Sequence, residues 1–251
     1  MDEKSEGGQP DGLAPLSDSS YLCRVDDPAN MQSGESRQGA YSKRVRVYID
    51  GFNLYHAIAG LKDQRLKWLN FWRLSETLLE EGEILDEVNF FTAVLTWNKE
   101  KQQRHVNFLN ACRAVGVRVH EANFKQSHKV CLAYERQCKF FEEKQTDVAI
   151  AVMMVSDAIA RNFDRAILIT ADSDQVPTAR FIAQVPGVKL TLIFPPGRKT
   201  TARELSNIIP DRHELSLGRL LTCQLPRSVS NEAGRVVATM PALYMTSPIS
   251  N

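Results

Sequence analysis

The sequence lacks the features that would assign it to a membrane, to a secretory route or to a nucleotide cofactor. No segment has the roughly 18 consecutive apolar residues that a membrane-spanning helix requires. The start, MDEKSEGGQPDG, has no basic segment followed by an apolar one, so we expect no secretory signal. No Gly-x-Gly-x-x-Gly motif follows an expected strand, which argues against a conventional dinucleotide-binding loop.

Cysteine is also scarce. The five cysteines are odd in number and irregularly spaced: Cys23, Cys112, Cys131, Cys138 and Cys223. Such spacing in a chain of 251 residues does not suggest a disulfide framework. We therefore expect reduced thiols and a cytoplasmic protein.

The chain has almost no net charge, but its charges are unevenly distributed. The formal net charge is +1, from 31 basic and 30 acidic residues. Residues 1–40 contain eight acidic and three basic residues and carry −5, so the remainder carries +6. This asymmetry makes the rest of the chain suitable for an anionic partner.

Composition divides the chain into three parts. Residues 1–42 are rich in Gly, Ser, Asp, Gln and Pro, which predicts a disordered acidic head. Residues 43–225 contain the periodic apolar segments and predict one α/β domain. Residues 226–251 return to Pro, Ser, Thr, Asn and Gly, and we expect a loosely ordered tail.

Within residues 43–225, expected strands alternate with expected helices. The strands are expected at 44–50, 88–94, 117–120, 166–171 and 188–194, and the helices at 71–81, 99–115, 147–163 and 176–185. This alternation predicts an α/β fold with a mostly parallel central sheet and helices on both faces.

Acidic residues stand where two expected strands end. Asp50 and Asn53 follow the first strand. Asp172 and Asp174 follow the fourth, and Asp147 opens the helix that leads into it. Ligand crevices of parallel sheets lie beyond the carboxyl ends of the strands, so we expect these side chains at one edge. Because clustered carboxylates repel one another, they indicate a hard divalent cation, Mg²⁺ or Mn²⁺, and phosphodiester hydrolysis.

Helix capping is the simpler explanation for some of these aspartates. Asp147 and Asp174 stand near expected helix starts, where Asp commonly accepts backbone N–H bonds. Asp50 ends a strand before Gly51, so capping explains it less readily, and Gly51 would let the backbone approach a substrate closely. The metal hypothesis therefore depends on the whole set of aspartates.

Three segments carry a resemblance to one family: YIDGFNLY (48–55), EKQTDVAIAV (143–152) and ITADSDQVP (169–177). They closely resemble the three motifs of NYN domains of the LabA/DUF88 type, in the PIN-like nuclease superfamily, over about residues 44–215. The resemblance implies a PIN-like, Rossmannoid three-layer sandwich and a Mg²⁺- or Mn²⁺-dependent ribonuclease. By matching positions it implies the metal ligands and catalytic residues Asp50, Asp147, Asp172 and Asp174, with Asn53 as a polar catalytic companion.

Two positions depart from the family pattern. Met153 stands where a further Asp is common, and Gln175 stands where an aromatic residue usually follows the paired aspartates. A thioether is a poor ligand for a hard cation. These departures leave open a member of the family that binds without cutting, or one with other chemistry.

Basic residues suggest how RNA would be held. Arg198, Lys199 and Arg203 follow the last expected strand, so we expect them at the same edge as the aspartates, bound to phosphates. A second basic stretch that ends at Lys144 is interleaved with aromatic residues, a pattern that suits single-stranded RNA. A solvated loop whose aromatics face the core explains that stretch more simply.

Three alternatives remain open. One is an NYN-like 6-hydroxy-3-succinoylpyridine 3-monooxygenase of nicotine degradation, an NADH-dependent hydroxylase of a small aromatic substrate that could also use a flavin. Another is a non-catalytic RNA-binding module. A zinc site at His128, Cys131 and Cys138 would be a third, although this spacing matches no usual ligand framework.

Overall fold

The computed structural model describes residues 42–94, 97–131, 136–200 and 202–245, with the backbone alone for 123–131 and 136–144. The predicted acidic head lies outside the described residues apart from Ser42. All described residues belong to one compact unit. None of the helices in this part of the chain is both long enough and apolar enough to cross a bilayer.

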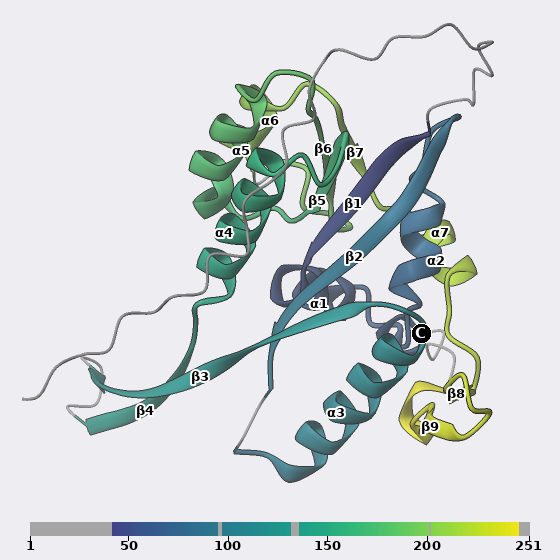
Figure 1. Cartoon of the computed structure of the whole chain (residues 1–251). Helices are drawn as coiled ribbons and strands as arrows, with labels where there is room; N and C mark the ends of the chain where they lie inside the picture. Colours follow the sequence, from purple (N-terminus) through teal and green to yellow (C-terminus); the bar gives the residue numbers. More distant parts are fainter. Residues whose placement is uncertain (1–41, 95–96, 132–135, 201, 246–251) are drawn as a thin grey trace, which may run out of the picture. The chain divides into compact units, whose positions relative to one another are not determined.

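In the described part of the chain, the central sheet has seven strands. They are β1 (Lys43–Asp50), β2 (Glu83–Ala93), β3 (Arg118–Cys131), β4 (Arg136–Lys144), β5 (Arg165–Ile169), β6 (Lys189–Phe194) and β7 (Arg212–Glu214). Their order is β4-β3-β2-β1-β5-β6-β7, and every neighbouring pair is parallel except the antiparallel pair β3–β4 (Figure 1). The predicted α/β fold with a mostly parallel sheet is confirmed. β2, β3 and β4 follow one another on one side of β1, and β5, β6 and β7 follow on the other side. The strand order thus reverses between β1 and β5, and ligands of such sheets bind at the carboxyl ends of the strands at this point.

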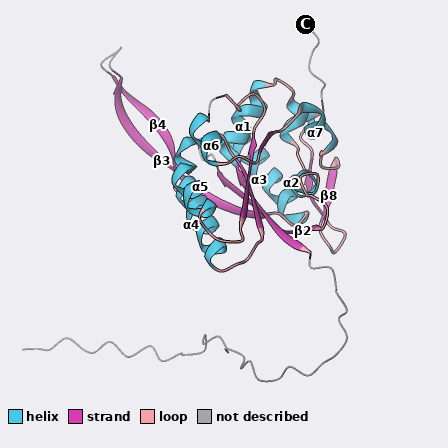
Figure 2. Cartoon of the chain, turned by 90° about the horizontal axis from the view of Figure 1, so that it is seen from above, coloured by secondary structure: helices cyan, strands magenta, loops and turns pink. Residues whose placement is uncertain are grey.

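Helices cover both faces of this sheet (Figure 2). The longer elements are α1 (Gly51–Gly60), α2 (Phe71–Glu76), α3 (Lys99–Ala114), α4 (Thr146–Ile159), α5 (Val176–Ala183), α6 (Arg203–Ile208) and α7 (Leu217–Thr222). The short 3₁₀ turns are η1 (Gln64–Lys67), η2 (Ser173–Gln175) and η3 (Ala242–Tyr244).

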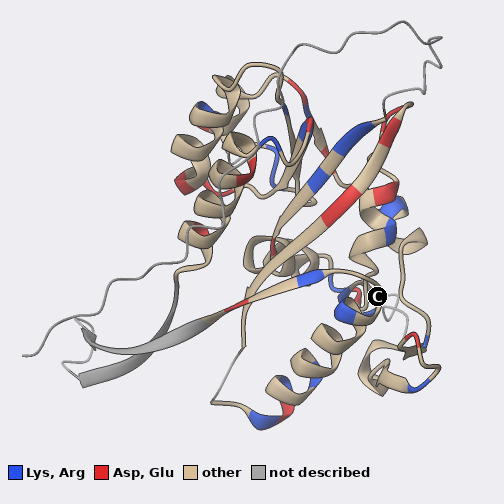
Figure 3. Cartoon of the chain, in the orientation of Figure 1, with Lys and Arg blue, Asp and Glu red and all other residues tan. Residues whose placement is uncertain are grey.

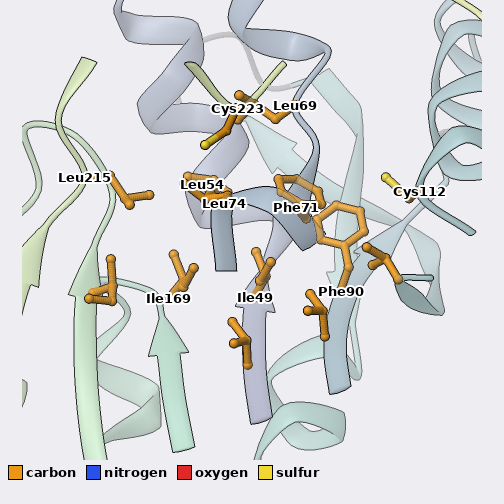
Figure 4. Packing of buried hydrophobic residues seen from close by; sticks show 14 of the residues in the cluster. Ile49, Leu54, Leu69, Phe71, Leu74, Phe90, Cys112, Ile169, Leu215 and Cys223 are labelled. Atoms are coloured by element: carbon orange, nitrogen blue, oxygen red, sulfur yellow. The ribbon is translucent and has the colours of Figure 1, made fainter. Parts of the chain in front are cut away.

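Successive residues of the strands pack into two apolar cores, one on each face of the sheet. Val47 and Ile49 of β1 pack with α1, α2, α3 and α7 in one apolar cluster, part of which Figure 4 shows. Tyr48 points to the opposite face and packs with α4, α5 and α6. Successive side chains of a strand point to opposite faces, so this alternation produces a three-layer sandwich.

The β3–β4 pair extends the sheet in a way that the sequence pattern did not predict. β3 pairs with β2 over Arg118–Ala122 and with β4 over Asn123–Cys131. The pair reaches out beyond the helical layers (Figure 2). Only residues 117–120 were predicted as strand, because the segment that follows is polar and lacks a simple alternation.

Basic positions of β1 lie beside acidic positions of β2 (Figure 3), and Arg46 of β1 forms ion pairs with both β2 and α4. Arg46 forms ion pairs with Asp86 at 2.6 Å and with Asp157 of α4 at 3.1 Å. The Tyr48 hydroxyl donates to Asp157 at 2.6 Å. Burial favours protonation of Asp157, but the bonds from Tyr48 and Asn162 and the charge of Arg46 hold its pKa below the ordinary value. Asp157 therefore stabilises the packing of α4 against β1.

Gly51 is required by packing between α1 and β2. A Cβ at this position would stand 2.4 Å from the Phe91 carbonyl oxygen and 2.6 Å from the Phe90 ring. Such distances are far below van der Waals contact. The glycine thus lets the start of α1 lie close against β2. This role differs from the predicted one, in which Gly51 lets the backbone approach a substrate.

Residues 228–239 form a packed hairpin within the segment for which composition predicted a loosely ordered tail. β8 (Ser228–Ser230) pairs with β9 (Val236–Thr239), and Val229 and Ala238 are buried against Trp68 and Ala111. The Trp68 indole N–H donates to the Pro226 carbonyl at 2.9 Å. The hairpin is ordered by contacts with distant residues, which local composition does not record. The division of the chain at residue 226 stays a prediction.

Deletion of residues 226–251 tests this packing. We expect the free energy of unfolding to fall by roughly 2 kcal/mol, because Trp68 loses apolar cover and a hydrogen-bond acceptor. Urea unfolding of the full and shortened chains measures the difference. Equal stability of the two chains would show that the hairpin contributes nothing, as a loosely ordered tail implies.

Candidate metal centre

Three carboxylates from three elements meet at the carboxyl ends of β1 and β5. Asp50 is the last residue of β1, Asp172 follows β5, and Asp147 lies in the first turn of α4. β1 and β5 are parallel neighbours with Ile49 opposite Ile169, so both chains leave the sheet side by side. Each aspartate offers one oxygen, and these oxygens lie within 4.8 Å of one another.

Asp50 is held in place by the elements that it connects. It caps α1, accepting the Asn53 backbone N–H at 3.0 Å on one oxygen and the Thr170 hydroxyl at 2.8 Å on the other. The residue is only 3% exposed. Burial raises the pKa of the Asp50 carboxyl to about 6, the two hydrogen bonds oppose this, and the charges of Asp147 and Asp172 add to it.

Capping and clustering are not alternatives at this site. Asp50 was the aspartate that capping explained least readily in the sequence, yet its side chain caps α1. Asp172 also accepts a backbone N–H, from Asp174 at 3.0 Å. By contrast, α4 and α5 begin without a side-chain cap. Each carboxylate oxygen has two lone pairs, so an aspartate that caps a helix can still offer a lone pair to a ligand.

Thr170 and Asn53 tie the strand ends together. The Thr170 hydroxyl donates to Asp50 and accepts the Asp172 backbone N–H at 3.1 Å. The Asn53 amide oxygen accepts the Ala171 backbone N–H at 3.1 Å. Asn53 thus joins α1 to the turn that carries Asp172. The sequence pattern did not predict a role for Thr170. The position of its hydroxyl between an apolar strand and Asp172 could have indicated one.

Gln175 connects Asp147 to the same turn. Its side-chain amide donates to the Asp147 backbone carbonyl at 3.1 Å, and the residue is 1% exposed. Its Oε1 has no hydrogen-bond partner among the described residues. The carboxyl group of Asp147 is partly removed from water, although the residue as a whole is exposed. This partial burial and the negative charges of Asp172 and Asp174 raise the pKa of Asp147.

Asp174 adds charge to this centre, whereas Met153 contributes to apolar packing. Asp174 is an exposed residue of η2 whose charge acts on Asp147, but it is not one of the three carboxylates that meet within 4.8 Å in the described part of the chain. Met153 is partly buried against the core beneath α4. The position of the family's additional Asp thus serves apolar packing in this chain.

Three of the predicted phosphate-binding residues lie between the end of β6 and the first residue of α6. Arg198 and Lys199 are exposed after β6, whose carboxyl end is at the same sheet edge as those of β1 and β5. Arg203 is exposed at the start of α6, and α6 contacts η2. The side chain of Lys144 lies outside the described residues, as do those of the predicted zinc ligands His128, Cys131 and Cys138.

Comparison with known proteins places the chain in a family. It is 18% identical to a Vibrio parahaemolyticus protein of unknown function, whose crystal structure matches with a TM-score of 0.47 over 74% of this chain and 98% of that one. It is 23% identical over 244 residues to 6-hydroxy-3-succinoylpyridine 3-monooxygenase HspA of Pseudomonas putida, covering 82% of this chain and 76% of that protein. The model of the NYN domain matches residues 44–215, which include all three aspartates of the candidate metal centre, and the chain therefore belongs to the NYN domain family.

Proposed function

We propose that this protein is a divalent-metal-dependent ribonuclease that hydrolyses phosphodiester bonds of single-stranded RNA. The observation that carries the proposal is the convergence of Asp50, Asp147 and Asp172 within 4.8 Å at the carboxyl edge of the sheet. Membership of the NYN family supports a nuclease-type function.

The residues present fit a hard cation. The ligand set consists of carboxylate oxygens, which Mg²⁺ and Mn²⁺ prefer. The Oε1 of Gln175, which has no hydrogen-bond partner among the described residues, adds a buried acceptor next to Asp147, as expected where water or a ligand completes a site. We propose Asp50, Asp147 and Asp172 as ligands, with Asp174 adding negative charge at the edge of the site. A bound Mg²⁺ or Mn²⁺ would supply an activated water and neutralise charge on the phosphate.

The chain's own groups orient the site and hold the substrate. The bonds from Asn53 and Thr170 fix the Asp50 carboxylate before any ligand arrives. The Asn53 amide oxygen is engaged with Ala171, so we assign the orientation of water or substrate to its amide nitrogen. We propose that backbone phosphates bind to the exposed cations Arg198, Lys199 and Arg203, and to Lys144, which the sequence alone suggests.

Cleavage assays test the proposal. With Mn²⁺ or Mg²⁺, wild type should cleave a labelled single-stranded RNA, and Asp172→Asn should lose about 100-fold or more of kcat/KM because one charged ligand is lost. Glu232→Gln, which removes the charge of an exposed acid in the turn between β8 and β9, serves as the matched control and should cleave normally. Equal cleavage by wild type and Asp172→Asn would sink the nuclease proposal. RNA binding in EDTA without cleavage under any condition would favour the non-catalytic module.

A second candidate follows from the Pseudomonas relative. Identity of 23% over 244 residues to a named 6-hydroxy-3-succinoylpyridine 3-monooxygenase favours a monooxygenase of a small aromatic substrate. The resemblance stated from the sequence implies NADH as its reductant. Oxidation of NADH in the presence of 6-hydroxy-3-succinoylpyridine, with and without added flavin, measures that activity. NADH loss at the background rate in both arms would exclude this candidate.

We also propose that the protein works in the cytoplasm. Cys112 and Cys223 are buried free thiols, and burial raises the pKa of Cys112, which makes its thiol unreactive. Protein isolated without reductant and then unfolded should titrate five thiols with a disulfide reagent. Three or fewer would indicate a disulfide and an oxidising compartment.

A further inference from the structure

A group of exposed aromatic side chains begins two residues after Asp50. Phe52, Tyr55 and His56 lie on α1, with 47% of Phe52 and 50% of Tyr55 exposed. The centroids of the Phe52 and His56 rings are 4.4 Å apart in an edge-to-face arrangement. The centroids of the Tyr55 and His56 rings are 5.7 Å apart. We name these three residues the aromatic strip. Grouped exposed rings are unusual on a protein surface and mark interaction sites.

Cations accompany the aromatic strip. The Lys67 ammonium lies 5.3 Å from the centre of the Tyr55 ring. η3 packs against η1 and brings Tyr244 beside Tyr55, and Arg104 is hydrogen-bonded to Tyr244. The surface therefore combines flat apolar rings with positive charge. A ligand that offers both flat rings and negative charge matches it, and an unpaired nucleotide is such a ligand.

We propose that the aromatic strip is a base-stacking subsite that holds unpaired bases beside the phosphodiester bond to be cut. This inference rests on the proposed function, because it states how the substrate of that same site is held. Phe52 follows Asp50 in the first turn of α1, and the strip continues to His56 over a rise of about 6 Å along the helix. Bases bound there would leave their phosphate backbone next to the three carboxylates.

The charge of the surface favours this occupant over a second copy of the chain. A two-fold interface at the aromatic strip would bring Lys67 near the same cation of the other copy, which is unfavourable. Duplex RNA is also disfavoured, because its bases already stack on one another and their faces are not available.

Binding of a 12-nucleotide single-stranded RNA that contains 2-aminopurine tests the subsite. The measurement is made in EDTA, so that binding is separated from cleavage, and stacking on a ring quenches the 2-aminopurine fluorescence. We expect Phe52→Leu and Tyr55→Leu each to weaken Kd roughly tenfold and to relieve quenching, because Leu keeps apolar bulk but has no ring face. Phe52→Trp should retain both properties. Phe181→Leu, at an exposed phenylalanine of α5, is the matched control and should behave as wild type.

The outcomes separate this inference from the proposed function. Quenched binding by wild type that Phe52→Leu abolishes, without any metal-dependent cleavage, supports the stacking subsite and defeats the nuclease proposal. Cleavage by wild type together with unchanged Kd and quenching in both Leu variants supports the nuclease and overturns the subsite. The subsite is also overturned if wild type fails to bind the RNA or binds a duplex equally well. A change of oligomeric state in Phe52→Leu, measured by light scattering, would assign the aromatic strip to a second copy instead.

Discussion

Asp50→Asn is expected to abolish metal-dependent RNA cleavage while it makes the metal-free protein more stable. Burial raises the pKa of Asp50 to about 6 from an ordinary value of 3.8, so the folded protein holds an unfavourable charge at neutral pH. Asparagine has no charge, and its amide oxygen can still accept the Asn53 backbone N–H that starts α1. The free energy of unfolding in EDTA should therefore rise at pH 8, by at most about 3 kcal/mol.

The sign and the pH window follow from that raised pKa. As pH rises from about 4 to 6, the unfolded chain has already released the Asp50 proton while the folded chain still holds it. Wild type thus loses stability relative to Asp50→Asn across this window, and the difference is constant above it. Urea unfolding of both proteins at pH 4, 5, 6 and 8 gives the profile. An Asp50→Asn protein that is less stable than wild type at pH 8 would contradict the account.

Arg165→Met is expected to destabilise the fold by about 3–5 kcal/mol. Arg165 is 2% exposed on β5, and its guanidinium forms an ion pair with the buried Glu83 side chain. It also donates to the Thr191 hydroxyl at 3.1 Å and to the Leu78 carbonyl at 3.0 Å. Removing the guanidinium would leave the Glu83 charge buried and without its partner, which costs more than the pair contributes.

A matched set of variants isolates this effect. The double variant Arg165→Met/Glu83→Met removes both charges and should recover much of the lost stability. Lys189→Met, which breaks the exposed pair with Glu80, should change the free energy of unfolding by less than about 1 kcal/mol. A single Arg165→Met variant as stable as Lys189→Met would refute the role assigned to the buried pair.

The position of the aspartates at one edge of the sheet could be predicted from the sequence, because it depends on apolar runs that directly precede them. Val45, Val47 and Ile49 alternate before Asp50, and the apolar run 166–169 precedes Asp172. Parallel strands end at one edge, so placing the aspartates there needed no knowledge of side-chain contacts.

The remaining features depend on contacts between distant residues. The hairpin at 228–239 is ordered by Trp68, which lies more than 150 residues earlier in the chain. The role of Gln175 depends on its bond to the Asp147 carbonyl, and that of Thr170 on its bond to Asp50. Composition and spacing report none of these bonds, so these parts of the fold and site could not be predicted.

Binding of Mn²⁺ to the full chain, followed by electron paramagnetic resonance, tests most directly whether the three carboxylates form one cation site. At pH 7.5 wild type should bind Mn²⁺, and Asp50→Asn, Asp147→Asn and Asp172→Asn should each bind at least tenfold more weakly. The wild-type affinity should fall between pH 7.5 and 5.5, because the cation and the Asp50 proton compete around its pKa of about 6. Mn²⁺ binding that persists unchanged in the triple Asn variant, or no binding by wild type, would contradict the account.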